Sequence, residues 1–101
     1  MKRSGIYGRD EFRCVYCGLQ FPEDELTLDH VQPRVRGGDR SECNLVTACR
    51  GCNTLKGQKR LSLFLYENPL ARQNFARFAV NVWPRHLRML AEELARLDSV
   101  S

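Results

Sequence analysis

Residues 14–17 read Cys-Val-Tyr-Cys, and residues 49–52 read Cys-Arg-Gly-Cys. Each pair places two sulfur atoms within reach of one ion, and two such pairs complete a tetrahedral zinc site. A structural zinc site contributes on the order of 10 kcal/mol to folding, which is comparable to the whole stability of a small domain. We therefore expect structural Zn²⁺ to hold this fold together, with four ligands: Cys14, Cys17, Cys49 and Cys52.

The rest of the composition agrees with a metal-stabilised domain. The chain has 101 residues and five cysteines, and 43% of its residues are hydrophobic. Its first residues lack the apolar segment of a signal peptide, and no apolar run approaches the ~20 residues that span a bilayer. Cysteines in such a chain favour metal binding over disulfides. We expect a cytoplasmic protein with no membrane partner, in which Cys43 is a small buried apolar residue.

The segment between the cysteine pairs predicts two strands and a helix. Residues 25–31 alternate polar and apolar side chains, which indicates a short strand that ends before Pro33. Residues 45–47 predict a second strand, antiparallel to the first. Residues 49–55 predict a short helix, and Gly57 is a stop signal for it.

Beyond residue 60 the pattern becomes helical. We expect a helix at 62–67 capped by Ser62, and a last helix that begins near Pro84. Trp83 is expected in the core and His86 at the surface. The last helix carries an apolar stripe, which predicts a face packed in the core: Leu87, Leu90, Ala91, Leu94 and Leu97. The predicted organisation is a zinc-containing module at 1–60 and a C-terminal helical extension at 61–101, packed on the same domain.

Positive charge is concentrated around the second cysteine pair. The net charge of the chain is +4. Residues 34–60 carry seven basic and two acidic side chains, whereas residues 61–101 carry five basic and four acidic ones. A local excess of this kind is typical of a surface that binds a phosphate backbone. The same excess is also compatible with a solvated basic face that has no partner.

The four cysteines leave the other metal-binding side chains free for different chemistry. Asp29 directly precedes His30, and Asn44 and Asn53 follow at wider spacing. Together with Gly37-Gly38, Asn44-Leu45-Val46 and the Lys56-Gly57 pair, this pattern resembles the HNH endonuclease family. The resemblance covers residues 13–57 and implies an α+β fold, in which a ββα-metal core surrounds one divalent cation.

The resemblance implies a role for each residue of the pattern. His30 looks like the general base, since histidine can take a proton from water near neutral pH. Asp29 looks like a ligand of a catalytic Mg²⁺ or Mn²⁺ ion, because hard cations prefer oxygen ligands. Asn53 stands where many members have a third histidine and offers an amide oxygen to the same cation. Asn44 looks like the residue that holds His30 in orientation, through its side chain or the neighbouring backbone.

The implied activity is metal-dependent hydrolysis of DNA phosphodiester bonds, by nicking or cutting. Four side chains of the basic segment are candidate phosphate contacts: Arg34, Arg36, Lys56 and Lys59. Such contacts give affinity and little base specificity. Because one centre cuts one strand, double-strand cleavage would need a homodimer, a larger DNA-processing complex or sequential nicks.

Two alternatives of other classes stay open. A non-catalytic zinc module that binds nucleic acid, as a subunit of a larger DNA-processing machine, would use the basic segment alone. A zinc-stabilised protein–protein adaptor would instead use the apolar stripe at 87–97. Salt-sensitive DNA binding without metal-dependent cleavage would favour the first alternative, and absence of DNA affinity at low salt would favour the second.

Overall fold

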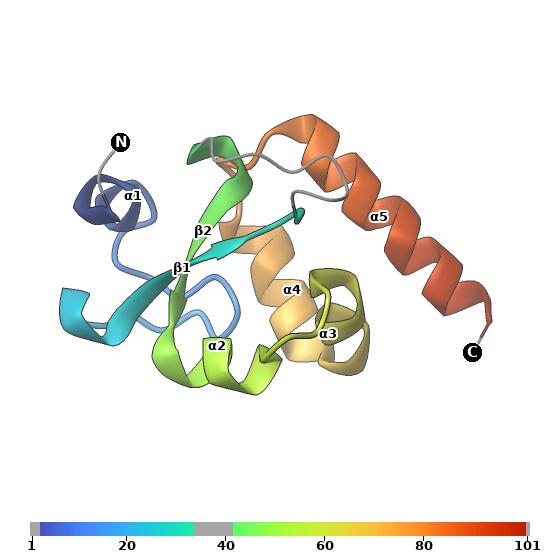
Figure 1. Ribbon diagram of the computed structural model, residues 1–101, viewed down its shortest axis with the longest axis horizontal. Coiled ribbons are helices and arrows are strands. Elements are labelled where there is room, and N and C mark those ends of the chain that lie inside the picture. Colours follow the sequence, from blue (N-terminus) through green and yellow to red (C-terminus); the bar gives the residue numbers. More distant parts are fainter. Residues whose placement is uncertain (1–2, 34–41, 101) are drawn as a thin grey trace.

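The computed structural model describes residues 3–33 and 42–100 of the chain. Two short strands cross the middle of the molecule, and helices surround them (Figure 1). The elements in chain order are α1 (Arg3–Arg9), the 3-10 turn η1 (Glu23–Glu25), β1 (Leu26–His30), the 3-10 turn η3 (Glu42–Asn44), β2 (Leu45–Cys49), α2 (Arg50–Lys56), α3 (Leu61–Glu67), α4 (Pro69–Phe78) and α5 (Pro84–Ser99). The fold is α+β, as the sequence predicts.

The strands β1 and β2 form an antiparallel pair, in which Leu26 lies opposite Cys49 and His30 lies opposite Leu45. β2 is buried along most of its length and runs directly into α2. Cys49 caps that helix, because its Sγ accepts a hydrogen bond from the backbone N–H of Cys52. Gly57 ends the helix with a positive φ of 59°. The predicted strand–strand–helix order is confirmed.

The sequence pattern did not reveal α1, which is attached to β2 by two adjacent charged residues. The guanidinium of Arg9 donates to the carbonyl oxygens of Glu42 and Leu45, at 2.8 Å each. The Asp10 carboxylate accepts from the backbone N–H and the hydroxyl of Thr47, at 3.1 and 2.8 Å. Arg9 and Asp10 also pair with each other. These bonds hold the backbone on both sides of Asn44.

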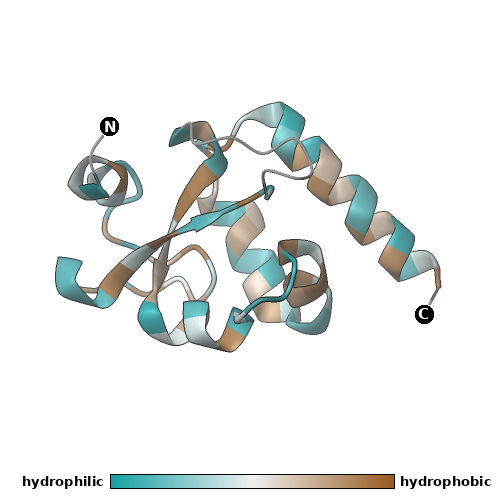
Figure 2. Cartoon of the chain, in the orientation of Figure 1, coloured by the Kyte–Doolittle hydropathy of each residue, from teal (hydrophilic) through white to brown (hydrophobic). Residues whose placement is uncertain are grey.

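The C-terminal helices share one hydrophobic core with the strands. Buried side chains of the strand region, such as Val31 and Val46, belong to the same cluster as Phe64 of α3 and Leu90 of α5. α3 packs against both α4 and α5. Apolar and polar residues alternate along α5, so that it presents one apolar face inwards (Figure 2). Leu90 and Leu94 of the predicted stripe are buried on this face.

No helix in the described ranges has the length and apolar character needed to cross a membrane.

Four local expectations are wrong. Ser62 is not the cap of α3, because the helix begins one residue earlier and Arg60 occupies the cap position. Cys43 is exposed, since it lies on η3 next to the buried Asn44. Trp83 is 45% exposed, whereas His86 is fully buried. The helical period explains the burial of His86, because it places this residue on the same face as Leu90 and Leu94, whereas Trp83 precedes the helix as its N-cap residue.

Candidate active site and metal centre

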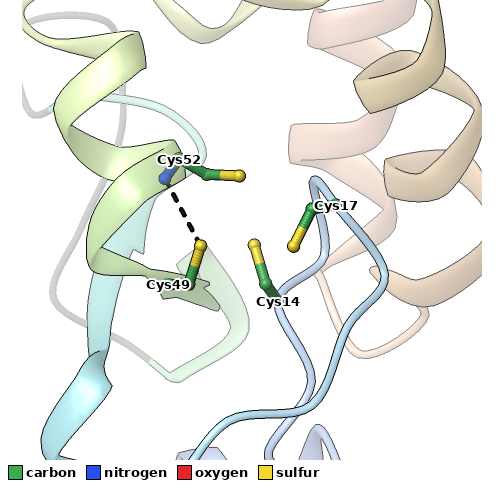
Figure 3. A group of neighbouring side chains, drawn as sticks. All are labelled: Cys14, Cys17, Cys49 and Cys52. Carbon is green, nitrogen blue, oxygen red and sulfur yellow. Dashed lines mark hydrogen bonds between the residues drawn. The ribbon is translucent and has the colours of Figure 1, made fainter.

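Four cysteine side chains converge on one point between the loop at 14–17 and the start of α2. Figure 3 shows the sulfur atoms of Cys14, Cys17, Cys49 and Cys52 turned towards one another, and these atoms all lie within 4.8 Å of each other. In the described ranges, this is the one group of three or more His, Cys, Asp or Glu side chains arranged to hold a metal ion. Gly18, with a φ of 77°, gives the loop its tight turn.

The electrostatics of this cluster call for a cation. Burial raises the pKa of Cys14 to about 11, and repulsion from Cys17 adds to the shift. Burial and the neighbouring thiols also raise the pKa of Cys52 well above its ordinary value. Despite burial, hydrogen bonds from Cys52, Cys14 and Cys17 instead lower the pKa of Cys49. A cation among the four sulfur atoms would compensate the charge of the thiolates that Cys14 and Cys52 disfavour when alone. A buried, all-sulfur, four-ligand set fits structural zinc.

Asp29 lies beside the cysteine cluster and is held by two donors. The Tyr16 hydroxyl donates to Oδ2 at 2.5 Å. The Lys56 ammonium lies 3.0 Å from Oδ1 and 2.9 Å from Oδ2. The side chains of Lys56 and Asp29 are only 9% and 12% exposed. Burial, together with the Asp29 charge, raises the pKa of Tyr16 well above its ordinary value, so its hydroxyl stays protonated and remains a donor.

His30 directly follows Asp29 on β1, and Asn53 lies on α2, which packs against β1. Successive strand residues point to opposite sides, so Asp29 turns towards α2 while His30, at the end of β1, is exposed. Asn53 is half-buried on α2, three residues before Lys56. Residues three apart share one face of a helix. Lys56 reaches Asp29 from α2, and Asn53 lies one helical turn earlier on the same helix.

Asn44 is fully buried and holds the backbone just beyond His30. Its Oδ1 accepts from the Gln32 N–H and its Nδ2 donates to the Gln32 carbonyl oxygen, at 2.9 Å each. Its own carbonyl oxygen accepts from the Val31 N–H at 2.9 Å. The sequence suggested that Asn44 orients His30 through its side chain or nearby backbone. The contacts described here fix the two residues that follow His30.

A polar chain of contacts links this segment to the C-terminal helices. The buried Gln32 side chain donates to Glu93 of α5 at 3.3 Å, and Glu93 pairs with Arg60 at 2.8 Å. Sequence reasoning missed Tyr16, Gln32 and Glu93. Tyr16 had a signal, since it lies inside the first cysteine pair, but nothing in the sequence distinguishes Glu93 from the acidic residue beside it.

The four candidate phosphate contacts fall in different environments. Lys56 is buried against Asp29. Lys59 is exposed and pairs with Glu67 at 2.7 Å. Arg34 and Arg36 lie outside the described residues. The structure thus places one of the four beside the candidate catalytic carboxylate.

The family model described as HNH endonuclease matches residues 14–59. This stretch contains both cysteine pairs, both strands and α2, with Asp29, His30, Asn44 and Asn53. Residues 14–59 of the chain are thus similar to HNH endonucleases.

Two Cas9 proteins are similar to the chain, one in sequence and one in structure. The CRISPR-associated endonuclease Cas9 of Corynebacterium diphtheriae is 32% identical over 57 residues, which cover 55% of this chain and 5% of that protein. The crystal structure of the Type II-C Cas9 enzyme from Actinomyces naeslundii matches with a TM-score of 0.59 and 21% identity. The match covers 91% of this chain and 10% of the solved one. At this identity the second likeness shows the fold, which here includes the C-terminal helices. The chain thus corresponds to a small part of much larger enzymes.

Proposed function

We propose that the protein is a metal-dependent endonuclease that hydrolyses DNA phosphodiester bonds. The observation that carries the proposal is the arrangement around β1: a partly buried carboxylate, Asp29, in contact with Lys56 of α2 and directly before an exposed histidine. The match of residues 14–59 to the HNH endonuclease family supports this interpretation.

His30 would act as the general base. Its exposure lets a water molecule and a phosphate group reach the imidazole, and histidine changes protonation near neutral pH. The residues after it are fixed by Asn44 and Gln32, so the imidazole projects from an anchored strand end. Positioned general bases contribute roughly 10²- to 10⁴-fold to rate.

Asp29 and Asn53 would hold the catalytic cation. Carboxylate and amide oxygens are the ligands that Mg²⁺ and Mn²⁺ prefer, and the two side chains come from facing elements. When bound, the cation would supply stabilisation of the negative charge that develops on the phosphate and the leaving oxygen. Lys56 contacts the same carboxylate and would offer a second positive group to an approaching phosphate.

DNA binding would rest on the basic segment at 34–60. Arg34, Arg36, Lys56 and Lys59 are the proposed phosphate contacts, with affinity that falls as salt rises. Because the similar Cas9 proteins are far longer than this chain, we propose that the domain works within a larger DNA-processing assembly or as a dimer.

One observation favours a second candidate, the non-catalytic nucleic-acid-binding module. Lys56 contacts both oxygens of Asp29, so this carboxylate has a counter-ion within the protein and could be a structural ion-pair partner. Under this alternative the domain binds DNA in a salt-dependent way, and Mg²⁺ changes nothing.

A plasmid-relaxation assay separates the two candidates. Supercoiled DNA is incubated with the protein and Mg²⁺ or Mn²⁺, alongside His30→Ala and the control Glu92→Ala, which changes an exposed side chain of α5. The proposal predicts metal-dependent nicking by the wild type and the control. For His30→Ala it predicts a loss of roughly 100-fold or more with DNA binding retained in a gel-shift assay. Equal nicking by His30→Ala contradicts the mechanism, and binding without nicking by the wild type supports the second candidate.

A further inference from the structure

We propose that Tyr16 is a positioning residue that couples the cysteine cluster to the catalytic carboxylate. It would do so by fixing the side chain of Asp29 through its hydroxyl. The inference rests on the proposed function, because it concerns the affinity of the cation site that contains Asp29. It assigns a role to the side chain between the two cysteines of the first pair.

The ring of Tyr16 is immobilised by its neighbours. The residue is 1% exposed. Phe64 of α3 meets the ring edge-on, with centroids 5.3 Å apart, and Phe75 of α4 stacks against it at 6.2 Å. A ring enclosed in this way holds its hydroxyl at one place, and that hydroxyl lies 2.5 Å from Asp29 Oδ2.

The backbone of Tyr16 is tied to the cysteine cluster. Its N–H donates to Cys14 Sγ at 3.4 Å, and the next residue along the chain is the ligand Cys17. Its carbonyl oxygen accepts from the Asn74 side chain at 2.8 Å. The zinc-binding loop, the aromatic core and Asp29 therefore meet at a single residue.

Of the two donors on Asp29, Tyr16 is the one that can set its geometry. Lys56 reaches the carboxylate with the end of a long side chain and contacts both oxygens, so it does not distinguish one oxygen from the other. Tyr16 approaches from the immobile core and takes Oδ2, which selects the orientation in which Asp29 presents Oδ1. Hydrogen bonds that orient a ligating carboxylate typically change metal affinity or activity by about 10- to 100-fold.

The test compares two losses of a buried hydroxyl. Tyr16→Phe keeps the ring and its contacts with Phe64 and Phe75 but removes the donor to Asp29. Tyr7→Phe is the matched control, because the buried Tyr7 hydroxyl donates to the Leu26 carbonyl oxygen at 3.2 Å, at the opposite end of β1. Mn²⁺ binding is measured by electron paramagnetic resonance, zinc content by elemental analysis, and stability by thermal unfolding. Asp29→Asn marks the Mn²⁺ site.

We expect Tyr16→Phe to bind Mn²⁺ about 10-fold more weakly, with unchanged zinc content, and Tyr7→Phe to bind Mn²⁺ like the wild type. Cleavage by Tyr16→Phe should need more Mn²⁺ for half-maximal rate and recover at saturation. Equal Mn²⁺ affinity of the two variants, with wild-type binding that Asp29→Asn abolishes, overturns the inference and leaves the proposed function standing. A wild type that binds no Mn²⁺ at Asp29 overturns both.

Discussion

Replacing Asn44 by alanine should destabilise the protein far more than an ordinary loss of one amide. The Asn44 side chain is fully buried and makes two hydrogen bonds with the Gln32 backbone. Its Oδ1 accepts from the N–H, and its Nδ2 donates to the carbonyl oxygen. Alanine removes both hydrogen bonds. Because the Gln32 residue is itself only 2% exposed, water has little access to its backbone N–H and carbonyl.

The magnitude follows from these two bonds. A hydrogen bond contributes roughly 0.5–1.5 kcal/mol net, and a buried group left without a partner costs about 1–3 kcal/mol. Losing two bonds to one buried peptide backbone therefore costs on the order of 3 kcal/mol. In a chain of this size, that lowers the melting temperature by roughly 12–24 °C. Asn44→Asp should cost at least as much, since it turns a buried carboxylate oxygen towards the Gln32 carbonyl.

Urea unfolding followed by circular dichroism, at saturating zinc, measures this free energy. The control is Asn68→Ala, which removes one hydrogen bond from a half-buried amide to the Phe64 carbonyl oxygen and should cost about 1 kcal/mol. If Asn44→Ala loses no more stability than Asn68→Ala, then the two hydrogen bonds of Asn44 do not hold the Gln32 backbone in place. The role of Asn44 in orienting the segment after His30 would have to be abandoned.

Three further predictions follow. Cys17→Ser removes one of four sulfur ligands, so zinc content in elemental analysis and melting temperature in calorimetry should both fall. An unchanged melting temperature would argue against structural zinc. Lys56→Met leaves the 12%-exposed Asp29 carboxylate without its ion-pair partner, so stability should fall by about 3 kcal/mol at saturating zinc without Mg²⁺. Added Mg²⁺ should stabilise this variant more than it stabilises the wild type. Thermal unfolding with and without Mg²⁺ tests this, and an equal Mg²⁺ effect in both proteins would contradict a cation site at Asp29. Glu93→Gln breaks a half-exposed ion pair, so stability should change by less than about 1 kcal/mol, while plasmid nicking should slow because Gln32 loses a charged partner; an unchanged rate would mean that α5 does not support the site.

The zinc cluster and the strand–strand–helix order could be predicted because their signals are local. Two ligands separated by two residues, a period-two strand and a glycine after a helix are each signals that act within a few residues. Cys14 and Cys17 meet Cys49 and Cys52 because the loop at 14–17 lies against β2, where the Val15 N–H donates to the Thr47 carbonyl oxygen at 3.0 Å.

The partners of Asp29 could not be predicted in the same way. Tyr16 and Lys56 are 13 and 27 residues away from it in sequence, and either residue alone has an ordinary local explanation. Only the packing of the aromatic core fixes where the Tyr16 hydroxyl lies. The burial of His86 is different, since its position four residues before Leu90 on α5 carried the signal and residue type outweighed it. The exposed Trp83 ring instead packs under the Arg85 guanidinium, 4.9 Å from its centroid.

The shared hydrophobic core argues against treating residue 60 as a boundary between two independently stable units. Val31 and Val46 would face water if the helices beyond that residue were removed, because Phe64 and Leu90 belong to their cluster. Burial of apolar surface is the main favourable term in folding, so a core shared between two segments makes them unfold together. The Gln32–Glu93 contact extends this dependence to the backbone next to His30. We infer that the C-terminal helices and residues 14–59 form one cooperative unit, in which the geometry of the proposed active site depends on helices that contribute none of its reacting groups.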